Sequence, residues 1–295
     1  MLDILPTFII PGAEKSGTSY VAHILSQHPD VYIPYIKEPE FFRAVRGGIG
    51  HNKGYSYYRR LLAPGRDAKE LGDASTAYLW DPSSPQLIAQ YVPDVKLIVI
   101  LRNPVDKTYS HYWEQIKAGC KLPDFGGGLA SGDEQIGHLV ERSQYDVQLK
   151  RYSSLFGREQ MLILLYDDLE NNRASFFGRI CAFLDLSPLP DHVDLRVRVN
   201  PSGIPRLQTV ARLLSNQKFL NLFRAAPAPL ASKMRRVLYS MRKLNFRRGT
   251  YPPMDQETRR RLIDVFRPSV AGLAELIHSD LTHWFAMPEM KQEES

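Results

Sequence analysis

The stretch FIIPGAEKSGTSYVAHILSQHPDV, residues 8 to 31, decides the fold. It opens with a short apolar run that Pro11 and Gly12 end, and after a loop it continues into a helical pattern from Thr18 to Gln27. A strand, a loop and a helix in this order form the building unit of α/β proteins with parallel sheets. The stretch therefore predicts a first strand and a first helix joined by a glycine-containing loop.

Strand and helix signals continue to alternate along the chain. The apolar strand candidates at 69–75, 96–102 and 160–169 are separated by helical patterns at about 83–91, 104–117, 138–156 and 170–184. This alternation is typical of a parallel sheet covered on both faces. The predicted fold class is α/β, a P-loop-like three-layer fold with a central parallel sheet flanked by helices, in a single domain over 1–295. The glycine-rich residues 124–134 are expected to form a mobile surface loop.

Composition limits the class of protein. The chain has 295 residues and 43% hydrophobic content, which suffices for a large core. No apolar run approaches the roughly 20 residues of a membrane span, and the N-terminus lacks the basic flank of a signal peptide, so a cytoplasmic location is expected. Cys120 and Cys181 lie outside any CxxC or Cys/His cluster, so neither a disulfide framework nor a zinc site is indicated.

The positive charge of the chain is concentrated in one segment. Residues 206 to 248 contain eleven Lys or Arg and no Asp or Glu, which exceeds the net charge of +6 of the whole chain. Within this segment we expect a basic helical insertion or lid at 205–245. Its apolar residues recur at helical spacing and either pack on the core or form a lid that meets an anionic glycan or a membrane surface. No nucleic-acid-binding motif accompanies the charge, so no nucleic-acid partner is expected.

The first loop departs from an ATP-binding loop. Gly12 and Gly17 keep the spacing of GxxxxGK[ST], but Thr18 stands at the lysine position and the lysine has moved to Lys15. The loop can still bind a phosphate at a helix N-terminus. The strong strand at 96–102 ends in Arg102, where kinases commonly place a magnesium-binding aspartate, and an arginine repels a metal ion. A donor whose transferred group needs no metal, such as a sulfuryl group, fits this loop.

Three motifs in order resemble the sulfotransferases that use 3′-phosphoadenosine 5′-phosphosulfate (PAPS). They are PGAEKSGTS with the helix end LSQHPDV, then KEPEFF, then LRNPVDKTYSHY. The chain is most similar to the carbohydrate O- and N-sulfotransferases of the heparan sulfate type and their bacterial relatives, over residues 7 to about 185 and again over 247–284. The resemblance implies metal-independent, in-line transfer of a sulfuryl group to an acceptor hydroxyl, on a carbohydrate or glycolipid.

The resemblance also implies a donor site. Lys15 and the backbone amides of the following residues would bind the 5′-phosphosulfate, and Lys15 would neutralise charge as the S–O bond breaks. Arg102 and Ser110 would hold the 3′-phosphate. A basic loop ahead of the last helix would close over that phosphate. The donor-binding residues are thus Lys15, Ser16, Gly17, Thr18, Ser19, Arg102, Ser110, Arg247, Arg248, Gly249 and Thr250.

KEPEFF offers two candidate bases. If the segment is extended, Glu38 and Glu40 project to the same face. The resemblance, in which a glutamate lies three residues before the paired aromatics, favours Glu38 as the catalytic base and leaves Glu40 in reserve. The family's second lysine is missing, since GDASTAY places Asp73 and Ala74 where charge is expected. Asp73 and Ser75 either contact sugar hydroxyls or cap the end of their strand.

Two other functions agree with parts of the sequence. A nucleotide kinase with a degenerate phosphate loop predicts an aspartate at a strand end, where the chain has Arg102. A non-enzymatic basic adaptor would bind anionic polymers or membranes through residues 206–248, and removing Lys15 would leave that binding unchanged. The identity of the acceptor is not written in any of these motifs.

Overall fold

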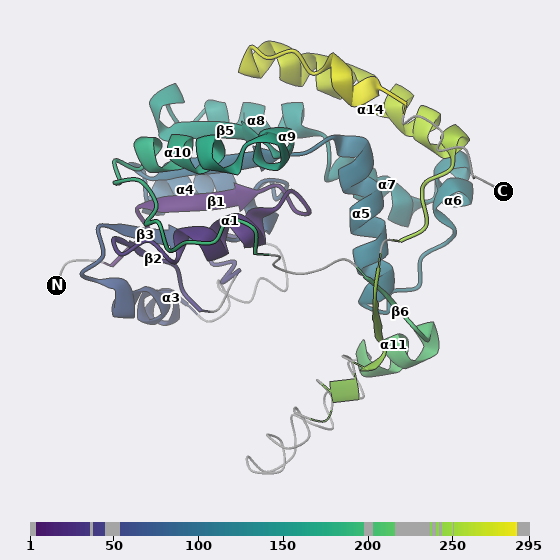
Figure 1. Ribbon diagram of the computed structural model, residues 1–295. Coiled ribbons are helices and arrows are strands. Elements are labelled where there is room, and N and C mark those ends of the chain that lie inside the picture. The colour runs from purple at the N-terminus through teal and green to yellow at the C-terminus, as the bar shows by residue number, and fades with distance from the viewer. Residues whose placement is uncertain are drawn as a thin grey trace. The chain divides into compact units, whose positions relative to one another are not determined.

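The computed structural model describes residues 4–35, 38–44, 54–197, 203–215, 237, 240–241, 244–249 and 251–287. The chain forms two compact units (Figure 1). The sheet unit comprises Met1–Lys107, Arg142–Val199 and Ile263–Ser295, and the helical unit comprises Thr108–Glu141 and Asn200–Leu262. The single domain over 1–295, with its insertion at 205–245, stays a prediction.

Five parallel strands form the centre of the sheet unit. Their order is β2-β3-β1-β4-β5, so that β1 lies between β3 and β4. The strands are β1 (Phe8–Gly12), β2 (Val31–Tyr32), β3 (Glu70–Asp73), β4 (Lys96–Leu101) and β5 (Met161–Leu165). Because all five run in one direction, the loops that follow them gather at one edge of the sheet, here called the carboxyl edge.

Both faces of this sheet are buried. Phe8, Ile10 and Ile98 pack in one core with residues of α1 (Thr18–Leu25), α9 (Tyr166–Asn171) and α10 (Arg173–Phe183). Ile9 and Leu97 alternate with them in sequence and are also fully buried, on the opposite face. Figure 1 shows helices on either side of the strands. The predicted α/β fold with a helix-flanked parallel sheet is confirmed.

The other described helices mostly follow the expected pattern. The patterns at 83–91 and 104–117 correspond to α4 (Ser84–Tyr91) and α5 (Pro104–Lys117). The sheet unit also contains α3, α8 and four 3₁₀ helices, at Tyr55–Leu62, Tyr145–Ser153, Ala63–Gly65, Thr76–Tyr78, Arg158–Gln160 and Thr282–Phe285.

The helix expected at 138–156 is in fact two helices. The chain leaves helical geometry after α7 (Glu134–Glu141) and re-enters it at Tyr145 in α8. The fully buried Lys107 donates from Nζ to the carbonyl of Arg142, 2.7 Å away, within the break. Burial lowers the pKa of Lys107 to about 8. A buried ammonium requires an acceptor, and a carbonyl freed from helical bonding supplies one.

Two other boundaries differ from the sequence pattern. The glycine-rich residues expected as a loop include α6 (Phe125–Ser131), which Asp124 caps by accepting from the Gly127 amide at 2.9 Å. Gly132 ends this helix with φ of 71°, a conformation that glycine adopts without strain. Strand β5 ends at Leu165 rather than 169, because α9 begins at Tyr166.

The helical unit combines α5 from Thr108 onward with α6, α7 and a two-stranded antiparallel ribbon. The ribbon pairs β6 (Gly203–Pro205) with β7 (Phe246–Arg248). Helix α11 (Gln208–Ser215) follows β6, and α14 (Gln256–Ile277) begins after Asp255, which accepts from the Thr258 amide at 2.8 Å. Much of the basic segment lies outside the described residues.

Candidate active site at the carboxyl edge of the sheet

The loop after β1 has an unusual backbone. Lys15 has φ of 63° and Gly17 has φ of 79°, both in the left-handed region. A glycine adopts this conformation freely, whereas a lysine does so at a cost of about 1–3 kcal/mol. Residues held in this way concentrate at functional sites. Lys15 is therefore held in a backbone conformation that a lysine does not favour.

The two glycines of the loop are required by packing as well as by φ. A Cβ atom at Gly12 would lie 2.6 Å from the Cβ of Leu79, closer than real carbon contacts. A Cβ at Gly17 would lie 3.1 Å from side-chain atoms of Tyr166 and Leu169, in addition to the strain of its φ. Close packing, together with the turn, thus explains the glycine spacing that the sequence shares with ATP-binding loops.

Helix α1 begins at Thr18 with no side chain capping its first amides. Ser16 and Thr18 are buried, and Ser19 is half-buried. A helix N-terminus of this kind offers backbone N–H donors and the positive end of the helix dipole to an anion. The predicted phosphate-binding residues Ser16, Gly17, Thr18 and Ser19 therefore lie in a segment that suits a phosphate.

Arg102 lies next to this loop, as the parallel sheet requires. It follows β4, the neighbour of β1, and its Nη1 donates to the Lys15 carbonyl at 3.1 Å. Its guanidinium carbon lies 4.9 Å from the centroid of the Tyr166 ring, at the end of β5. The loop after β1 and the residues after β4 and β5 are thereby joined through one arginine. The structure brings Lys15 and Arg102 together, while their roles toward a donor stay a prediction.

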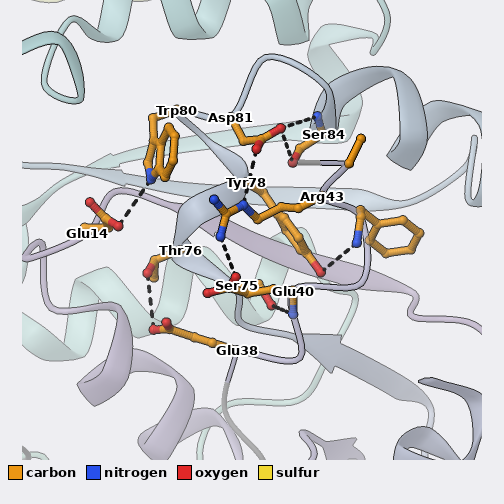
Figure 2. Close-up of polar contacts among 12 residues, drawn as sticks. Glu14, Glu38, Glu40, Arg43, Ser75, Thr76, Tyr78, Trp80, Asp81 and Ser84 are labelled. Carbon is orange, nitrogen blue, oxygen red and sulfur yellow. Dashed lines mark hydrogen bonds and ion pairs between the residues drawn. The ribbon is translucent and has the colours of Figure 1, made fainter. Parts of the chain in front are cut away.

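The two glutamates of KEPEFF point to different partners. Their φ values are 61° and 49°, so the backbone is not extended at either residue, and the condition under which the two side chains would share a face is not met. Glu38 accepts from the hydroxyl of Thr76 at 3.2 Å. Glu40 forms an ion pair with Arg43 at 2.5 Å, and Arg43 also binds Asp81 at 3.2 Å. Figure 2 shows the two carboxylates with these separate partners.

A tryptophan next to this cluster connects it with the loop after β1. Trp80 donates from its indole nitrogen to Glu14, the residue before Lys15, at 3.2 Å (Figure 2). The guanidinium carbons of Arg142 and Arg43 lie 4.0 and 4.9 Å from the Trp80 ring centroid, within cation–π range. Nothing in the sequence pattern marked Arg43 or Thr76, because their contacts with Asp81 and Glu38 each join residues 38 positions apart.

Asp73 is fully buried at the end of β3. It accepts from the hydroxyls of Tyr58 at 2.8 Å, Tyr78 at 3.0 Å and Ser75 at 2.6 Å. Burial raises the pKa of Asp73, the nearby Glu38 adds a smaller increase, and these hydrogen bonds lower it; the resulting pKa is about 6. Since Asp73 and Ser75 are both inaccessible to solvent, the interpretation that they contact sugar hydroxyls is wrong. They close the end of the strand from inside the core.

The helical unit carries the remaining predicted donor residues. Ser110 lies on α5, is 3% exposed, and accepts from the hydroxyl of Tyr251 at 2.7 Å. Arg247 and Arg248 lie on β7, where they pair in register with Ile204 and Gly203, and Gly249 follows the strand. Thr250 lies outside the described residues. The sequence analysis did not include Tyr251, although it stands directly after the predicted basic loop.

Among the described residues, no group of three or more His, Cys, Asp or Glu side chains is arranged to hold a metal ion. No described helix is long and apolar enough to cross a membrane.

Comparison with known proteins identifies the family. The model of the sulfotransferase domain matches residues 5–201, more than half of the chain, so the chain belongs to this family. It is 26% identical over 272 residues to human heparan sulfate glucosamine 3-O-sulfotransferase 3B1, covering 90% of this chain and 61% of that protein. It is 25% identical over 291 residues to mouse bifunctional heparan sulfate N-deacetylase/N-sulfotransferase 4, covering 94% of this chain and 30% of that protein.

A solved structure gives the same result over nearly the whole chain. The crystal structure of a sulfotransferase from Alicyclobacillus acidocaldarius superposes with a TM-score of 0.68 at 28% identity. The match covers 96% of this chain and 99% of that one. The predicted relation to sulfotransferases, and to the heparan sulfate type among them, is confirmed. The chain spans less than two thirds of the length of the two curated relatives named above.

Proposed function

We propose that this protein is a PAPS-dependent sulfotransferase that moves a sulfuryl group to a hydroxyl of a carbohydrate or glycolipid. The observation that carries the proposal is the loop after β1, where Lys15 is held in a left-handed conformation and its carbonyl accepts from Arg102. Of the five non-glycine residues with positive φ in the described part of the chain, Lys15, Glu38 and Glu40 all follow strands at the carboxyl edge. Strain collected there favours a reaction site.

The donor contacts follow from the chemistry of the loop. The amides at the start of α1 and the hydroxyls of Thr18 and Ser19 would bind the 5′-phosphate, and Lys15 would neutralise the bridging oxygen as its bond to sulfur breaks. Arg102 offers a planar guanidinium to the 3′-phosphate, with Ser110 and the residues 247–250 as further ligands. The chemistry supplied by the donor is the sulfuryl group itself, and we propose that no metal takes part.

Glu38 is the better base of the two glutamates. Glu40 forms an ion pair with Arg43, whereas Glu38 accepts from the hydroxyl of Thr76, and we assign the base to Glu38, which the resemblance to the family also favours. In the proposed reaction the acceptor oxygen forms a bond to sulfur, the bridging S–O bond breaks, and the acceptor proton passes to Glu38. The leaving group is 3′-phosphoadenosine 5′-phosphate (PAP). A positioned base of this kind contributes about 10²- to 10⁴-fold to the rate.

The charge of the basic segment and the names of the two curated relatives support an assignment of the acceptor class. The names of the two curated relatives refer to heparan sulfate, a carbohydrate. The eleven Lys and Arg residues between 206 and 248, with no acidic residue among them, would attract an anionic glycan or an anionic glycolipid surface. We therefore propose an anionic carbohydrate as the acceptor class, approached through this segment.

Isothermal titration with PAP tests the donor assignment. Wild type should bind PAP without a divalent metal, and Arg102→Ala should weaken that binding by roughly 10- to 100-fold, the value of a hydrogen bond to a charged group. Arg179→Ala is the matched control, because Arg179 forms an exposed ion pair with Asp168. Tighter binding of ATP with magnesium than of PAP would support the kinase alternative and refute our proposal.

A further inference from the structure

Tyr251 makes a hydrogen bond that is unusual for a residue at the start of a loop. Its hydroxyl donates to Oγ of Ser110 at 2.7 Å, within the helical unit. Ser110 is 3% exposed and Tyr251 is half-buried, so the bond is partly buried. The two residues are 141 positions apart in the chain, and no sequence pattern joins them.

Aromatic contacts fix the Tyr251 ring in place. It stacks on Trp113, with ring centroids 5.9 Å apart and planes 3° apart, and meets the edge of Tyr109 at 6.1 Å and 85°. The hydroxyl of Tyr109 donates to the carbonyl of Pro252 at 2.9 Å, which ties the next residue to the same helix. Three residues of α5, namely Tyr109, Ser110 and Trp113, therefore hold the segment that directly follows the predicted basic loop.

The direction of the hydrogen bond has a chemical consequence for Ser110. A serine hydroxyl has one proton to donate, and its oxygen can accept. When the oxygen accepts from Tyr251, the proton of Ser110 is directed away from that bond and becomes a better donor, because hydrogen bonds in a chain polarise one another. An anionic oxygen is the partner that gains most from a donor polarised in this way.

We infer that Tyr251 is a positioning residue for the 3′-phosphate of the donor, acting through Ser110. The inference rests on the proposed function, which makes Ser110 a ligand of that phosphate. Tyr251 orients the Ser110 proton toward the phosphate, and its stack on Trp113 keeps the chain after Arg247, Arg248 and Gly249 attached to α5. Tyr251 does not touch the reacting atoms and is not a catalytic residue.

The test compares two nucleotides that differ only in the 3′-phosphate. PAP and adenosine 5′-monophosphate (AMP) are titrated into wild type, Tyr251→Phe, Ser110→Ala and the double variant. Phenylalanine keeps the ring that stacks on Trp113 and removes only the hydroxyl. We expect Tyr251→Phe to weaken PAP binding by roughly 5- to 10-fold and to leave AMP binding unchanged. The double variant should bind PAP as Ser110→Ala does, because the two residues act in one chain.

Tyr112→Phe is the matched control. Tyr112 lies on the same helix in the same aromatic cluster, but its hydroxyl donates to the carbonyl of Pro123 at 3.1 Å. This variant should keep the wild-type ratio of PAP to AMP affinity. A general loss of packing would weaken the binding of both nucleotides and leave this ratio unchanged, so a lower ratio reports on the 3′-phosphate alone. Unchanged or tighter PAP binding by Tyr251→Phe would overturn the inference; tighter binding would mean that the hydroxyl occupies the place of the phosphate.

The same titration separates the two proposals. If wild type binds PAP no better than AMP, the donor assignment fails and the role of Tyr251 fails with it. If wild type prefers PAP and Tyr251→Phe keeps that preference, the donor assignment stands and only the role of Tyr251 is refuted. Additive effects of Tyr251→Phe and Ser110→Ala would likewise show that Tyr251 does not act through Ser110.

Discussion

Glu38 and Glu40 are two positions apart, but Glu38 accepts from a hydroxyl and Glu40 is paired with an arginine. Glu38→Gln should lower kcat by roughly 10²- to 10⁴-fold while PAP affinity changes little, because a base acts on the acceptor proton and not on the donor. The measurement is steady-state sulfation of a heparan-type oligosaccharide, with PAP titration alongside.

Glu40→Gln serves as the contrast to Glu38→Gln. It removes one of two ion pairs of Arg43 and keeps the pair with Asp81, so it should destabilise the fold by about 1 kcal/mol and lower kcat far less. Thermal unfolding measures the first effect and the same assay measures the second. A larger loss of kcat in Glu40→Gln than in Glu38→Gln would exchange the roles of the two glutamates.

Asp73 should make the stability of the protein depend on pH. Its folded-state pKa is raised from 3.8 to about 6, so the folded state binds this proton more tightly than the unfolded state. The stabilisation is fully present below about pH 4 and is lost as pH rises through 6, by about 3 kcal/mol in total. Between pH 5 and 7.5, the unfolding free energy of wild type should fall by about 1 kcal/mol more than that of Asp73→Asn.

Urea unfolding at several pH values checks this expectation. Parallel pH profiles of wild type and Asp73→Asn would show that Asp73 keeps its usual pKa in the fold. Asn accepts at one oxygen only, so the variant should also be less stable overall, since it loses part of the bonding from Tyr58, Tyr78 and Ser75.

At the scale of elements, the first strand, loop and helix work as one rigid piece. Gly12→Ala should destabilise the fold by about 1–3 kcal/mol, because its Cβ would overlap the Cβ of Leu79. Gly137→Ala is the control, since it lies within α7 with no atom near its added Cβ. It should raise stability by up to about 1 kcal/mol, the helix propensity difference. Calorimetric unfolding of both variants measures these changes in stability. Equal changes in the two variants would contradict the packing argument.

Local sequence patterns predicted helices and strands well where burial against the sheet is the dominant interaction. The alternation of apolar residues located β1, β4 and α5, because burial on a parallel sheet imposes it directly. The same patterns failed at α6, where three consecutive glycines hid a helix that Asp124 caps. They failed again at the break before α8, where the buried Lys107 supplies the reason from another part of the chain.

At the scale of the whole molecule, charge should govern association with anionic glycans. Heparin binding is expected to weaken steeply between about 0.05 and 0.5 M salt, since exposed charges are screened. Changing Arg235, Arg236, Arg242 and Lys243 to Ser should reduce heparin affinity by at least 10-fold and leave PAP binding intact. Changing four charged residues elsewhere, namely Arg158, Arg179, Arg196 and Arg267, should affect it less. Equal losses would show that net charge matters and the position of the segment does not.

The sequence by itself determined the fold class, the phosphate-type loop and the choice of Lys15 and Arg102. Each depends on residues that are close in the chain or on the ends of parallel strands, which the topology brings to one edge. Only the tertiary structure decided that Glu38 and Glu40 have separate partners, that Asp73 is buried, and that Tyr251 binds Ser110. The contacts of Asp73 with Tyr58, of Glu38 with Thr76 and of Ser110 with Tyr251 join residues 15, 38 and 141 positions apart. They depend on distance and burial in three dimensions, for which a single sequence carries no periodic signal.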